Sequence, residues 1–382
     1  MFTKADSQWM AHALRLAERG LYTTSPNPRV GCVLVKDGKI IGRGSHEYAG
    51  EAHAEVYALR DAKEAARGAT AYVTLEPCSH HGRTPPCADG LIKAGVARVV
   101  VAVQDPNPHV AGAGIARLRA AGIAVEVGLM ENAARELNIG FFSRMTFNLP
   151  WLRSKIAMSV DGGTALQNGV SQWITSADSR RDVQHWRARS CAVITGVGTV
   201  LADDPQLNVR VASENSQRIR QPLRVVLDSH LKIPLSAKIF QTPPSPAGRG
   251  DGGEGATLIY TATHDAEKIA SLQKLGAQIV VLPDAVGRVD LLAALRDLTA
   301  RGCNEVLLEA GSILNGAFLR AGLVDELVLY IAPQLLGDMA RGVAQLGELT
   351  TLDQRINMEW HDVRNVGKDL RVIARIKKDS NV

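Results

Sequence analysis

Hydrophobic and polar positions in the first part of the chain switch between the helical and the strand period. Residues 7–18 carry Trp9, Met10, Ala13, Leu14 and Ala17 at helical spacing, which predicts an amphipathic helix. Further helices are expected at 53–66, 87–94 and 114–121, and strands at 30–35, 39–43, 71–75, 98–103 and 123–127. Asp37-Gly38 between the first two strands is a hairpin signal. This alternation predicts a sheet flanked by helices, an α/β layered domain.

A second alternating pattern begins at Trp151, after an expected connecting helix at 131–145 and a boundary at Asn148-Leu149-Pro150. Strands are expected at 152–158, 192–195, 223–227, 258–260, 278–281, 305–309, 326–331 and 371–376, and helices at 177–189, 266–275, 289–300 and 314–321. We therefore divide the chain into two domains, 1–148 and 149–382. Residues 242–255, rich in Pro and Gly, are interpreted as a surface insertion in the second domain.

Composition narrows the class of protein. A length of 382 residues suits two domains, and the 46% hydrophobic content supplies a core for each. The net charge of +5 is mild and only 4% of residues are aromatic, which argues against nucleic-acid binding. The sequence shows neither an apolar run of about 18 residues nor a secretory signal. Its cysteines are Cys32, Cys78, Cys87, Cys191 and Cys303. This sparse, odd set favours a reduced compartment, so we expect a cytoplasmic protein without a membrane partner.

The motif with the clearest chemistry is His53-Ala54-Glu55, followed by Glu76-Pro77-Cys78 and Cys87. One imidazole and two thiolates can bind Zn²⁺ and leave its fourth tetrahedral position for water. Glu55, which is not a ligand, can then accept the proton of that water and return it to a leaving amine. This is the residue pattern of zinc-dependent base deaminases, except that residues 79–86 separate the cysteines instead of the usual two residues.

Other interpretations of these residues remain open. His and Glu side chains near a helix start are usually solvated, and a lone Cys is often a small buried apolar residue. A structural zinc site would need a fourth ligand, and His80 and His81 are the local candidates. A polynucleotide deaminase would need a basic, aromatic surface. Positions two apart in an ideal helix diverge by about 200°, so His53 and Glu55 share a site only if the first turn is irregular or the pocket wraps around it.

The second half contains weaker signals. Gly-containing turns at 195–199 and 309–312 each follow an expected strand and would let backbone N–H groups approach a phosphate. Neither turn is a full dinucleotide-binding fingerprint, and both are compatible with ordinary turns. Arg180, Arg181, Arg187 and Arg189 either bind an anionic small molecule or form a solvated helix face. Lys155 points to a ligand or to solvent, and Asp161 sits in a tight turn with its carboxylate facing a cleft.

The whole chain resembles the family of bifunctional riboflavin biosynthesis deaminase–reductases. The runs that carry the resemblance are 26–35, 42–46, 53–56 and 76–87 in the first half, and 155–162, 171–175, 195–207 and 309–311 in the second. The long spacing between Cys78 and Cys87 is a feature of this family. The resemblance implies an α/β protein with an N-terminal cytidine-deaminase-like three-layer domain and a C-terminal dihydrofolate-reductase-like domain.

The resemblance also implies two consecutive reactions on one small phosphorylated pyrimidine. The first domain would remove the 2-amino group of 2,5-diamino-6-ribosylamino-4(3H)-pyrimidinone 5′-phosphate hydrolytically, using one zinc ion. The second would use NADPH to reduce the ribosyl group to ribityl, giving 5-amino-6-ribitylamino-uracil 5′-phosphate. NADPH rather than NADH is inherited from the family, and an acidic Asp203 near the cofactor even argues against a phosphate there. A homo-oligomer, dimer or tetramer, is expected.

The family's site residues transfer to matching positions of this chain. The zinc ligands would be His53, Cys78 and Cys87, with Glu55 as the proton shuttle; Asn27 and His46 would hold the pyrimidine, and His80 and Arg83 would lie near its phosphate. In the reductase, Lys155, Ser171, Arg187, Leu207, Arg210 and Glu309 would line the substrate. NADPH would contact Ala157, Trp173, Thr199, Asp203, Gly311, Ser312, Ile313, Leu314, Asn315, Gly316 and Ala317. Guanidinium groups match phosphate oxygens in a bidentate way, which suits Arg187 and Arg210. Either Lys155 or Glu309 would assist ring opening or protonation.

Overall fold

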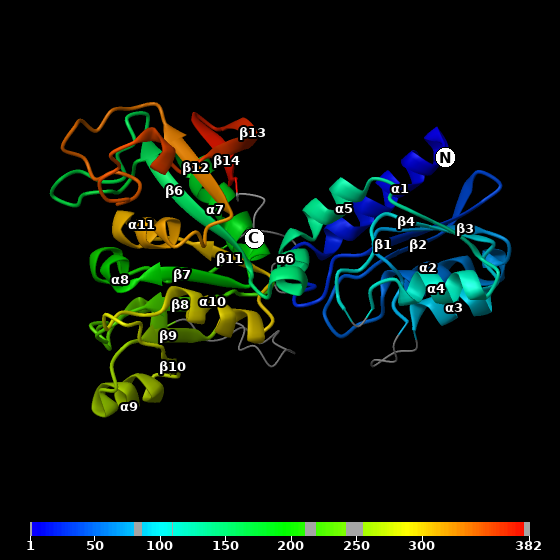
Figure 1. Cartoon of the computed structure of the whole chain (residues 1–382), viewed down its shortest axis with the longest axis horizontal. Helices are drawn as coiled ribbons and strands as arrows, with labels where there is room; N and C mark the ends of the chain where they lie inside the picture. Colours follow the sequence, from blue (N-terminus) through cyan, green and yellow to red (C-terminus); the bar gives the residue numbers. More distant parts are fainter. Residues whose placement is uncertain (1, 80–85, 109, 211–218, 242–254, 378–382) are drawn as a thin grey trace. The chain divides into compact units, whose positions relative to one another are not determined.

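The computed structural model describes residues 2–79, 86–108, 110–210, 219–241 and 255–377. The chain forms two compact units, Met1–Leu149 and Pro150–Val382, and each unit has its own sheet with helices packed on it (Figure 1). Among the described residues, helices of the length and apolarity needed to span a bilayer are absent.

The N-terminal unit is built on a five-stranded sheet with the strand order β2-β1-β3-β4-β5. Its strands are β1 (Gly31–Lys36), β2 (Lys39–Ser45), β3 (Thr70–Val73), β4 (Arg98–Val101) and β5 (Ala124–Val127). β1 is antiparallel to β2 and β3, whereas β3, β4 and β5 are parallel. Because parallel strands end at the same edge, the segments after β3 and β4 leave the sheet side by side.

Helices cover both faces of this sheet. They are α1 (Lys4–Ala17), α2 (Ala54–Ala62), α3 (Cys87–Ala94), α4 (Ala113–Ala120), α5 (Glu131–Leu137) and α6 (Ile139–Phe147), with 3-10 turns η1 (Glu18–Gly20) and η2 (Lys63–Ala66). Figure 1 shows α1 and α5 on one face and α2, α3 and α4 on the other, which is a three-layer arrangement. A Cβ added at Gly44 would overlap the Ala54 carbonyl oxygen, so this glycine lets the start of α2 pack directly on β2.

A buried carboxylate ties α1 to the sheet. Asp6 is 3% exposed and accepts hydrogen bonds from the Thr3 backbone N–H at 2.8 Å, the Tyr72 hydroxyl at 2.7 Å and the Arg98 guanidinium at 2.7 Å. The hydrogen bond from Arg98 is the largest influence on this carboxyl and, against the effect of burial, holds the pKa of Asp6 well below its usual range. Tyr72 lies on β3 and Arg98 on β4, so one side chain links three elements.

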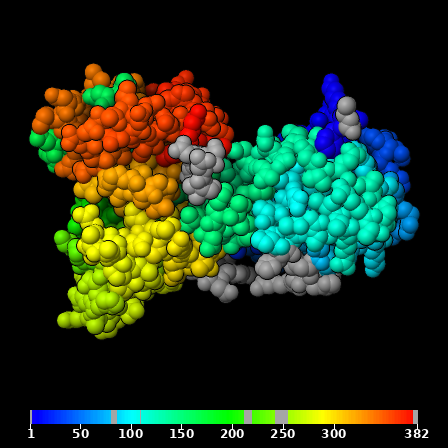
Figure 2. All heavy atoms as spheres, viewed as in Figure 1, coloured from blue at the N-terminus to red at the C-terminus, as the bar shows by residue number. Residues whose placement is uncertain are grey.

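The C-terminal unit contains a nine-stranded sheet with the order β10-β9-β8-β7-β11-β6-β12-β14-β13. Its strands are β6 (Trp151–Ser159), β7 (Ala192–Gly196), β8 (Leu223–Leu227), β9 (Thr257–Thr261), β10 (Gln278–Val281), β11 (Glu305–Leu308), β12 (Glu326–Ala332), β13 (Met358–Val366) and β14 (Asp369–Ile376). The strands from β10 to β12 are parallel, and β14 and β13 extend the sheet in antiparallel fashion. Figure 2 shows the orange-to-red surface of β12–β14 at one end of this unit and the yellow-green surface around β9 and β10 at the other.

Helices of the C-terminal unit connect the parallel strands. They are α7 (Ala177–Arg189), α8 (Val197–Asp203), α9 (Ala266–Lys274), α10 (Leu291–Ala300) and α11 (Ser312–Arg320), with 3-10 turns η4 (Lys238–Phe240) and η5 (Leu352–Gln354). One core cluster joins Val193, Val226, Ile259 and Leu307, which lie on four neighbouring strands, to Leu272 of α9. The sequences of these strands are continuous apolar runs because helices cover the strands.

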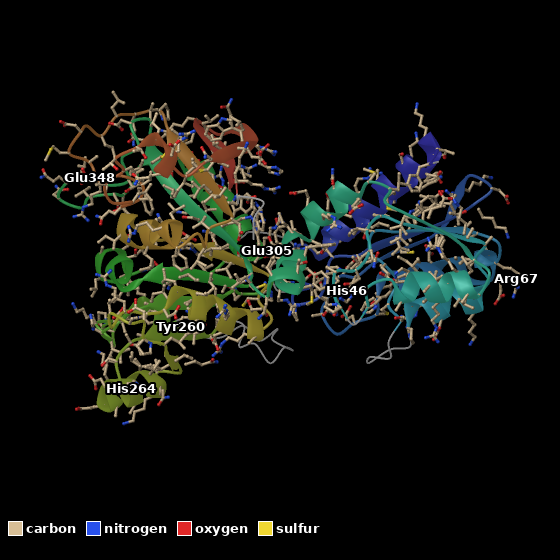
Figure 3. All side chains as sticks on the ribbon, viewed as in Figure 1. His46, Arg67, Tyr260, His264, Glu305 and Glu348 are labelled. Atoms are coloured by element: carbon tan, nitrogen blue, oxygen red, sulfur yellow. The ribbon has the colours of Figure 1, made fainter. Side chains whose placement is uncertain are left out.

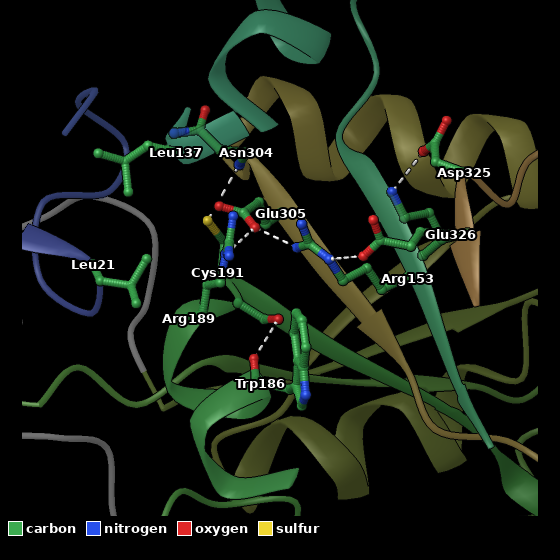
Figure 4. A network of polar contacts seen from close by, with 12 residues as sticks. Leu21, Leu137, Arg153, Trp186, Arg189, Cys191, Asn304, Glu305, Asp325 and Glu326 are labelled. Carbon is green, nitrogen blue, oxygen red and sulfur yellow. Dashed lines mark hydrogen bonds and ion pairs between the residues drawn. The ribbon is translucent and has the colours of Figure 1, made fainter. Parts of the chain in front are cut away.

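A network of buried charges crosses β6, β11 and β12 (Figure 4). Arg153, 3% exposed, donates to Glu305 and, at 2.6 Å, to Glu326. Arg189 of α7 donates to Glu305 at 2.6 Å and Arg375 of β14 to Glu326 at 3.0 Å. Every one of these buried charges has an opposite partner, which is the condition under which burial is tolerated.

The structure confirms the α/β class, corrects two expected helices and adds two elements that the sequence did not predict. The helix expected at 53–66 ends at Ala62 and gives way to η2. The helix expected at 131–145 is interrupted at Asn138, whose side chain binds the backbone N–H and carbonyl of Arg29. α8 was not expected because it begins Val-Gly-Thr, a run of weak helix formers. β13 was not expected because most of its residues are exposed on both faces and give no core pattern. The expected insertion, apart from Gly255, lies outside the described residues.

Replacing Asp6 by Asn should lower the free energy of unfolding of the N-terminal unit by about 2 kcal/mol near neutral pH, because Arg98 loses a charged acceptor. The folded-state pKa of Asp6 lies below its unfolded value, so the contribution is present above pH ~4 and fades as the pH falls further. Urea unfolding followed by hydrogen exchange of β3 and β4 amides measures both effects. Asp37→Asn, in an exposed turn, is the control, and equal stability of Asp6→Asn and wild type would contradict the assignment.

Candidate functional site

The His53, Cys78 and Cys87 side chains of the N-terminal unit converge. Their ligand atoms all lie within 4.8 Å of one another. His53 Nδ1 is 3.6 Å from Cys78 Sγ and 3.3 Å from Cys87 Sγ. Tetrahedral zinc with ordinary Zn–N and Zn–S bonds needs an N···S separation of about 3.6 Å. The donor set and its spacing therefore fit one zinc ion, with a coordination position to spare among the described residues.

Helix starts place two of these ligands. His53 has an extended backbone, with φ −76° and ψ 164°, and is the N-cap of α2, whereas Cys87 is the first residue of α3. Because His53 is outside the helix, the divergence of about 200° expected for helical positions two apart does not apply, and the imidazole and Glu55 can face one site. The Cys87 backbone N–H donates to Cys78 Sγ at 3.3 Å, as befits a thiolate near a helix N-terminus.

Glu55 lies beside this group and is 3% exposed. Burial raises the pKa of Glu55 to about 7, although the neighbouring His53 opposes the shift. A carboxyl group with a raised pKa at the edge of a metal site has the properties of a general acid–base group.

Two of the expected pyrimidine residues meet beside the metal ligands. Asn27 Nδ2 is 3.2 Å from His46 Nε2, and His46 Nδ1 is 3.1 Å from the Ala52 carbonyl oxygen. The rings of His46 and His53 are edge to face, with centroids 5.4 Å apart. His46 is packed among the side chains of the N-terminal unit and only 2% exposed, and this burial lowers its pKa (Figure 3). His46 thus orients Asn27 and His53. Asn27 is more exposed than His46. His80 and Arg83 lie outside the described residues.

In the C-terminal unit, Lys155, Arg187 and Glu309 come together at the end of β11. Arg187 donates to both Glu309 oxygens, from Nε at 2.5 Å and Nη2 at 3.0 Å, and Lys155 Nζ is 3.5 Å from Glu309 Oε2. Burial alone would raise the pKa of Glu309, but the charges of Arg187 and Lys155 lower it to about 2. The Nε–Nη2 edge of Arg187, expected to face a substrate phosphate, binds a carboxylate instead, and the partly exposed Lys155 side chain contacts the same carboxylate.

The two Gly-containing turns lie next to each other. Gly196 is the N-cap of α8 and Gly311 that of α11, and these helices follow β7 and β11, which are neighbours in the sheet. The Thr195 hydroxyl donates to the Glu309 carbonyl oxygen at 2.7 Å, and a Cβ at Gly196 would come within 3.2 Å of Leu314. An added Cβ at Gly198 or Gly311 would meet nothing within 4 Å. Open backbone at two helix starts on the carboxyl edge of a parallel sheet fits the pyrophosphate of a dinucleotide.

Other expected cofactor residues surround this edge. Trp173 is 68% exposed, and the Arg180 guanidinium lies 4.4 Å from its ring centroid. Gln172, which follows Ser171, donates to Asp203 of α8 at 3.3 Å. Thr199 also lies on α8, Ala157 on β6, and Ser312, Ile313, Leu314, Asn315, Gly316 and Ala317 on α11. Within α11, Ile313 is 67% exposed, whereas Asn315 is buried and bound to Ser154, so the helix offers only one side to a ligand.

The other residues expected at the reductase site have the following surroundings. Leu207 is a buried core residue, and Arg210 is exposed with its backbone N–H bound to Gln184. The four arginines of α7 do not form one anion site, since Arg181 pairs with Asp178 and Arg189 with Glu305. Asp161 accepts backbone N–H groups of Leu336 at 3.0 Å and Gly337 at 2.8 Å, so it joins two loops instead of facing a cleft.

Two residues near the sites were missed. The sequence indicates Arg180 only as part of a charge cluster, and Glu76 only as part of the Glu-Pro-Cys motif. Glu76 is 4% exposed, next to Pro77, and binds backbone N–H groups from residues far along the chain. Its position directly before Pro-Cys was the one signal in the sequence that could have drawn attention to it.

Comparisons with known proteins agree on both units. A family model described as the RibD C-terminal domain matches residues 150–372, and one described as the cytidine and deoxycytidylate deaminase zinc-binding region matches residues 3–103. The riboflavin biosynthesis protein RibD of Escherichia coli is 48% identical over 373 residues, covering 96% of this chain and 98% of that protein. The RibD of Haemophilus influenzae is 44% identical over 379 residues, 97% of each chain.

Solved structures give the same picture. RibD from Acinetobacter baumannii has a TM-score of 0.89 and 45% identity, covering 98% of this chain and 99% of that one. A diaminohydroxyphosphoribosylaminopyrimidine deaminase/5-amino-6-(5-phosphoribosylamino)uracil reductase from Thermotoga maritima has a TM-score of 0.83 and 32% identity, with coverage of 98% and 99%.

The geometry predicts that Cys87→Ala abolishes zinc retention, because only two of the three convergent donors remain. Wild type should carry about one zinc ion per chain after gel filtration, and the variant far less. Metal analysis by atomic emission measures this, with Cys303→Ala, a buried cysteine of the other unit, as the matched control. Full zinc occupancy in Cys87→Ala would show that the metal is held elsewhere.

Proposed function

The chain belongs to the RibD family of riboflavin biosynthesis proteins, and we propose that its two units act in succession on one phosphorylated pyrimidine. The enzyme is a bifunctional deaminase and reductase that uses Zn²⁺ and NADPH. Residues 1–148 form the deaminase domain and residues 149–382 the reductase domain. The convergence of His53, Cys78 and Cys87 beside the buried Glu55 is the observation that carries the first activity.

The substrate of the first step is 2,5-diamino-6-ribosylamino-4(3H)-pyrimidinone 5′-phosphate. His53, Cys78 and Cys87 hold the metal, which when bound supplies the Lewis acidity that makes water a nucleophile near neutral pH. Glu55 accepts the proton of the attacking water and delivers it to the departing 2-amino group, which leaves as ammonia. Asn27, oriented by His46 at 3.2 Å, holds the pyrimidine, and His80 and Arg83 lie toward its phosphate.

The second step opens the ribose ring and reduces its C1 carbon, giving 5-amino-6-ribitylamino-uracil 5′-phosphate. The turns at Gly196 and Gly311 would hold NADPH, which would supply a hydride when bound. The protein orients the sugar and provides the proton. A pKa of about 2 keeps Glu309 ionised, so it cannot donate a proton, and we assign proton donation to Lys155. The residues proposed to line the substrate also include Ser171, Leu207 and Arg210.

Two further expectations belong to this proposal. We expect the chain to act in the cytoplasm, supported by its five cysteines, which form no disulfide among the described residues. We also expect a homodimer or homotetramer, supported by β13, which is last in the order of the described sheet and carries Trp360 at 70% exposure. Analytical ultracentrifugation at micromolar concentration tests the second point, and a monomer there rejects it.

A paired assay on the purified, zinc-loaded protein tests the function. Ammonia release and NADPH oxidation are followed together after addition of the diaminopyrimidinone ribosyl phosphate, with and without a zinc chelator. We expect ammonia first, NADPH oxidation dependent on it, and loss of both with the chelator. If the chelator-treated enzyme still oxidises NADPH when given the deaminated intermediate, the two activities are separable. Absence of both signals from zinc-loaded enzyme would reject the substrate.

Glu55→Gln should reduce ammonia release by about 10²–10⁴-fold, because the isosteric amide cannot shuttle a proton. Zinc content should stay near the wild-type value, and NADPH oxidation with the deaminated intermediate should be unchanged. Glu51→Gln, at an exposed position before α2, is the control for a lost surface charge. Unimpaired deamination by Glu55→Gln would remove Glu55 from the role of proton shuttle.

Lys155→Met should slow NADPH oxidation with the deaminated intermediate by about 10²-fold or more, because the proton donor is lost. Single-turnover kinetics separate this effect from NADPH binding, whose affinity should change little. Lys274→Met, at the end of α9, should behave as wild type. An unchanged single-turnover rate in Lys155→Met removes Lys155 from the mechanism.

A further inference from the structure

Glu76 lies two residues before the metal ligand Cys78 and is almost completely buried, at 4% exposure. It follows β3, and its backbone N–H donates to the Val103 carbonyl oxygen at 3.0 Å beyond the end of β4. The side chain leaves the sheet at the edge where the segments after β3 and β4 run side by side.

Both oxygens of Glu76 accept two backbone hydrogen bonds each. Oε2 accepts from the N–H groups of Asp105 at 3.2 Å and Gly112 at 2.9 Å. Oε1 accepts from those of Gly114 at 2.9 Å and Ile115 at 3.2 Å. Gly112 to Ile115 form the start of α4, whose N-cap residue Gly112 has no side chain to satisfy these donors. Glu76 therefore caps α4 from a distant part of the chain.

The contact continues from Glu76 into the metal site. A Cβ added at Gly114 would overlap the Pro77 carbonyl oxygen, so α4 packs directly on the Pro77 peptide. On the other side, the Cys78 carbonyl oxygen accepts from the Ala88 N–H at 3.2 Å and Cys78 Sγ from the Cys87 N–H at 3.3 Å. Residues 76–78 are thus held between the N-termini of α3 and α4.

We propose that Glu76 is a positioning residue of the metal centre: by binding the start of α4 it fixes Pro77 and Cys78 and thereby sets the zinc affinity of the His53, Cys78 and Cys87 site. Partners that hold a metal ligand in place typically contribute 10–100-fold to metal affinity. The inference rests on the proposed zinc site but not on the identity of the substrate.

Glu76→Gln tests it, because the amide keeps the shape but turns one acceptor oxygen into an N–H₂ group that faces two donors. Competition with a chromophoric chelator should show zinc affinity about 10–100-fold lower than wild type. Co²⁺ bound in place of zinc should give an altered visible spectrum, since the Cys78 thiolate is displaced. Asp89→Asn, which removes the nearby surface pair with Arg117, should change neither readout.

Gly114→Ala perturbs the same contact from the other side. It should also lower zinc affinity, whereas Gly90→Ala on α3, where an added Cβ comes no closer than 3.5 Å to Leu59, should not. The effects of Glu76→Gln and Gly114→Ala should be less than additive in the double variant, because both release the Pro77-Cys78 segment.

A role of Glu76 in stability alone gives a different result: a lower melting temperature with unchanged zinc affinity and Co²⁺ spectrum in the folded protein. That outcome overturns the proposal. If Glu76→Gln does not fold, Gly114→Ala decides, and wild-type zinc affinity in a folded Gly114→Ala protein overturns it equally. NADPH oxidation with the deaminated intermediate confirms that the C-terminal unit is intact in each variant. If the wild-type protein fails to deaminate the pyrimidine and Glu76→Gln still weakens zinc binding, this inference stands and the proposed substrate is rejected.

Discussion

Unsatisfied N–H groups at helix N-termini are the constraint around which both sites are organised. Each helix begins with N–H donors that lack an intrahelical acceptor. In the N-terminal unit, His53 caps α2, Cys87 begins α3, and the Glu76 carboxylate binds the start of α4. In the C-terminal unit, α8 and α11 follow adjacent parallel strands, and the backbone is open at Gly198 and Gly311 near their starts. Cys78 Sγ accepts an N–H at the start of α3 and the Glu76 carboxylate accepts three at the start of α4, and the phosphates of a dinucleotide suit the donors in the second unit.

Buried charges in the C-terminal unit form two clusters along β11. Glu305 at the start of the strand binds Arg153 and Arg189, and Glu309 just after its end binds Lys155 and Arg187. Arg187 and Arg189 both come from the end of α7, so this helix is fixed along the strand by two ion pairs. The Glu305 side chain is 1% exposed and that of Glu309 10%. The cluster around Glu305 is therefore closed off in the core, whereas the cluster around Glu309 is the more exposed of the two.

The separation of interacting residues along the sequence explains which features could be predicted from it. His53, Cys78 and Cys87 lie in short motifs whose chemistry can be recognised locally, and most strands followed their apolar periodicity. Glu76 and Asp161 bind backbone N–H groups up to 39 and 176 residues away, and a backbone donor has no side-chain signature. β13 and α8 were missed for a related reason: one is an exposed edge without a core pattern, and the other is fixed by its place after β7 despite weak helix propensity.

Charge pairing also decides which groups are available for chemistry. Arg187 directs Nε and Nη2 to Glu309 and Nη1 to the Asn208 carbonyl oxygen at 3.1 Å, so all three nitrogens already have acceptors. A guanidinium does not deprotonate in proteins, and an ionised Glu309 has no proton to give. Lys155 contacts Glu309 at 3.5 Å through an ammonium with three rotatable donors. Among the three charged side chains that meet at β6, β11 and α7, Lys155 is therefore the one whose donors can turn toward a sugar oxygen, which is the basis of the role proposed for it.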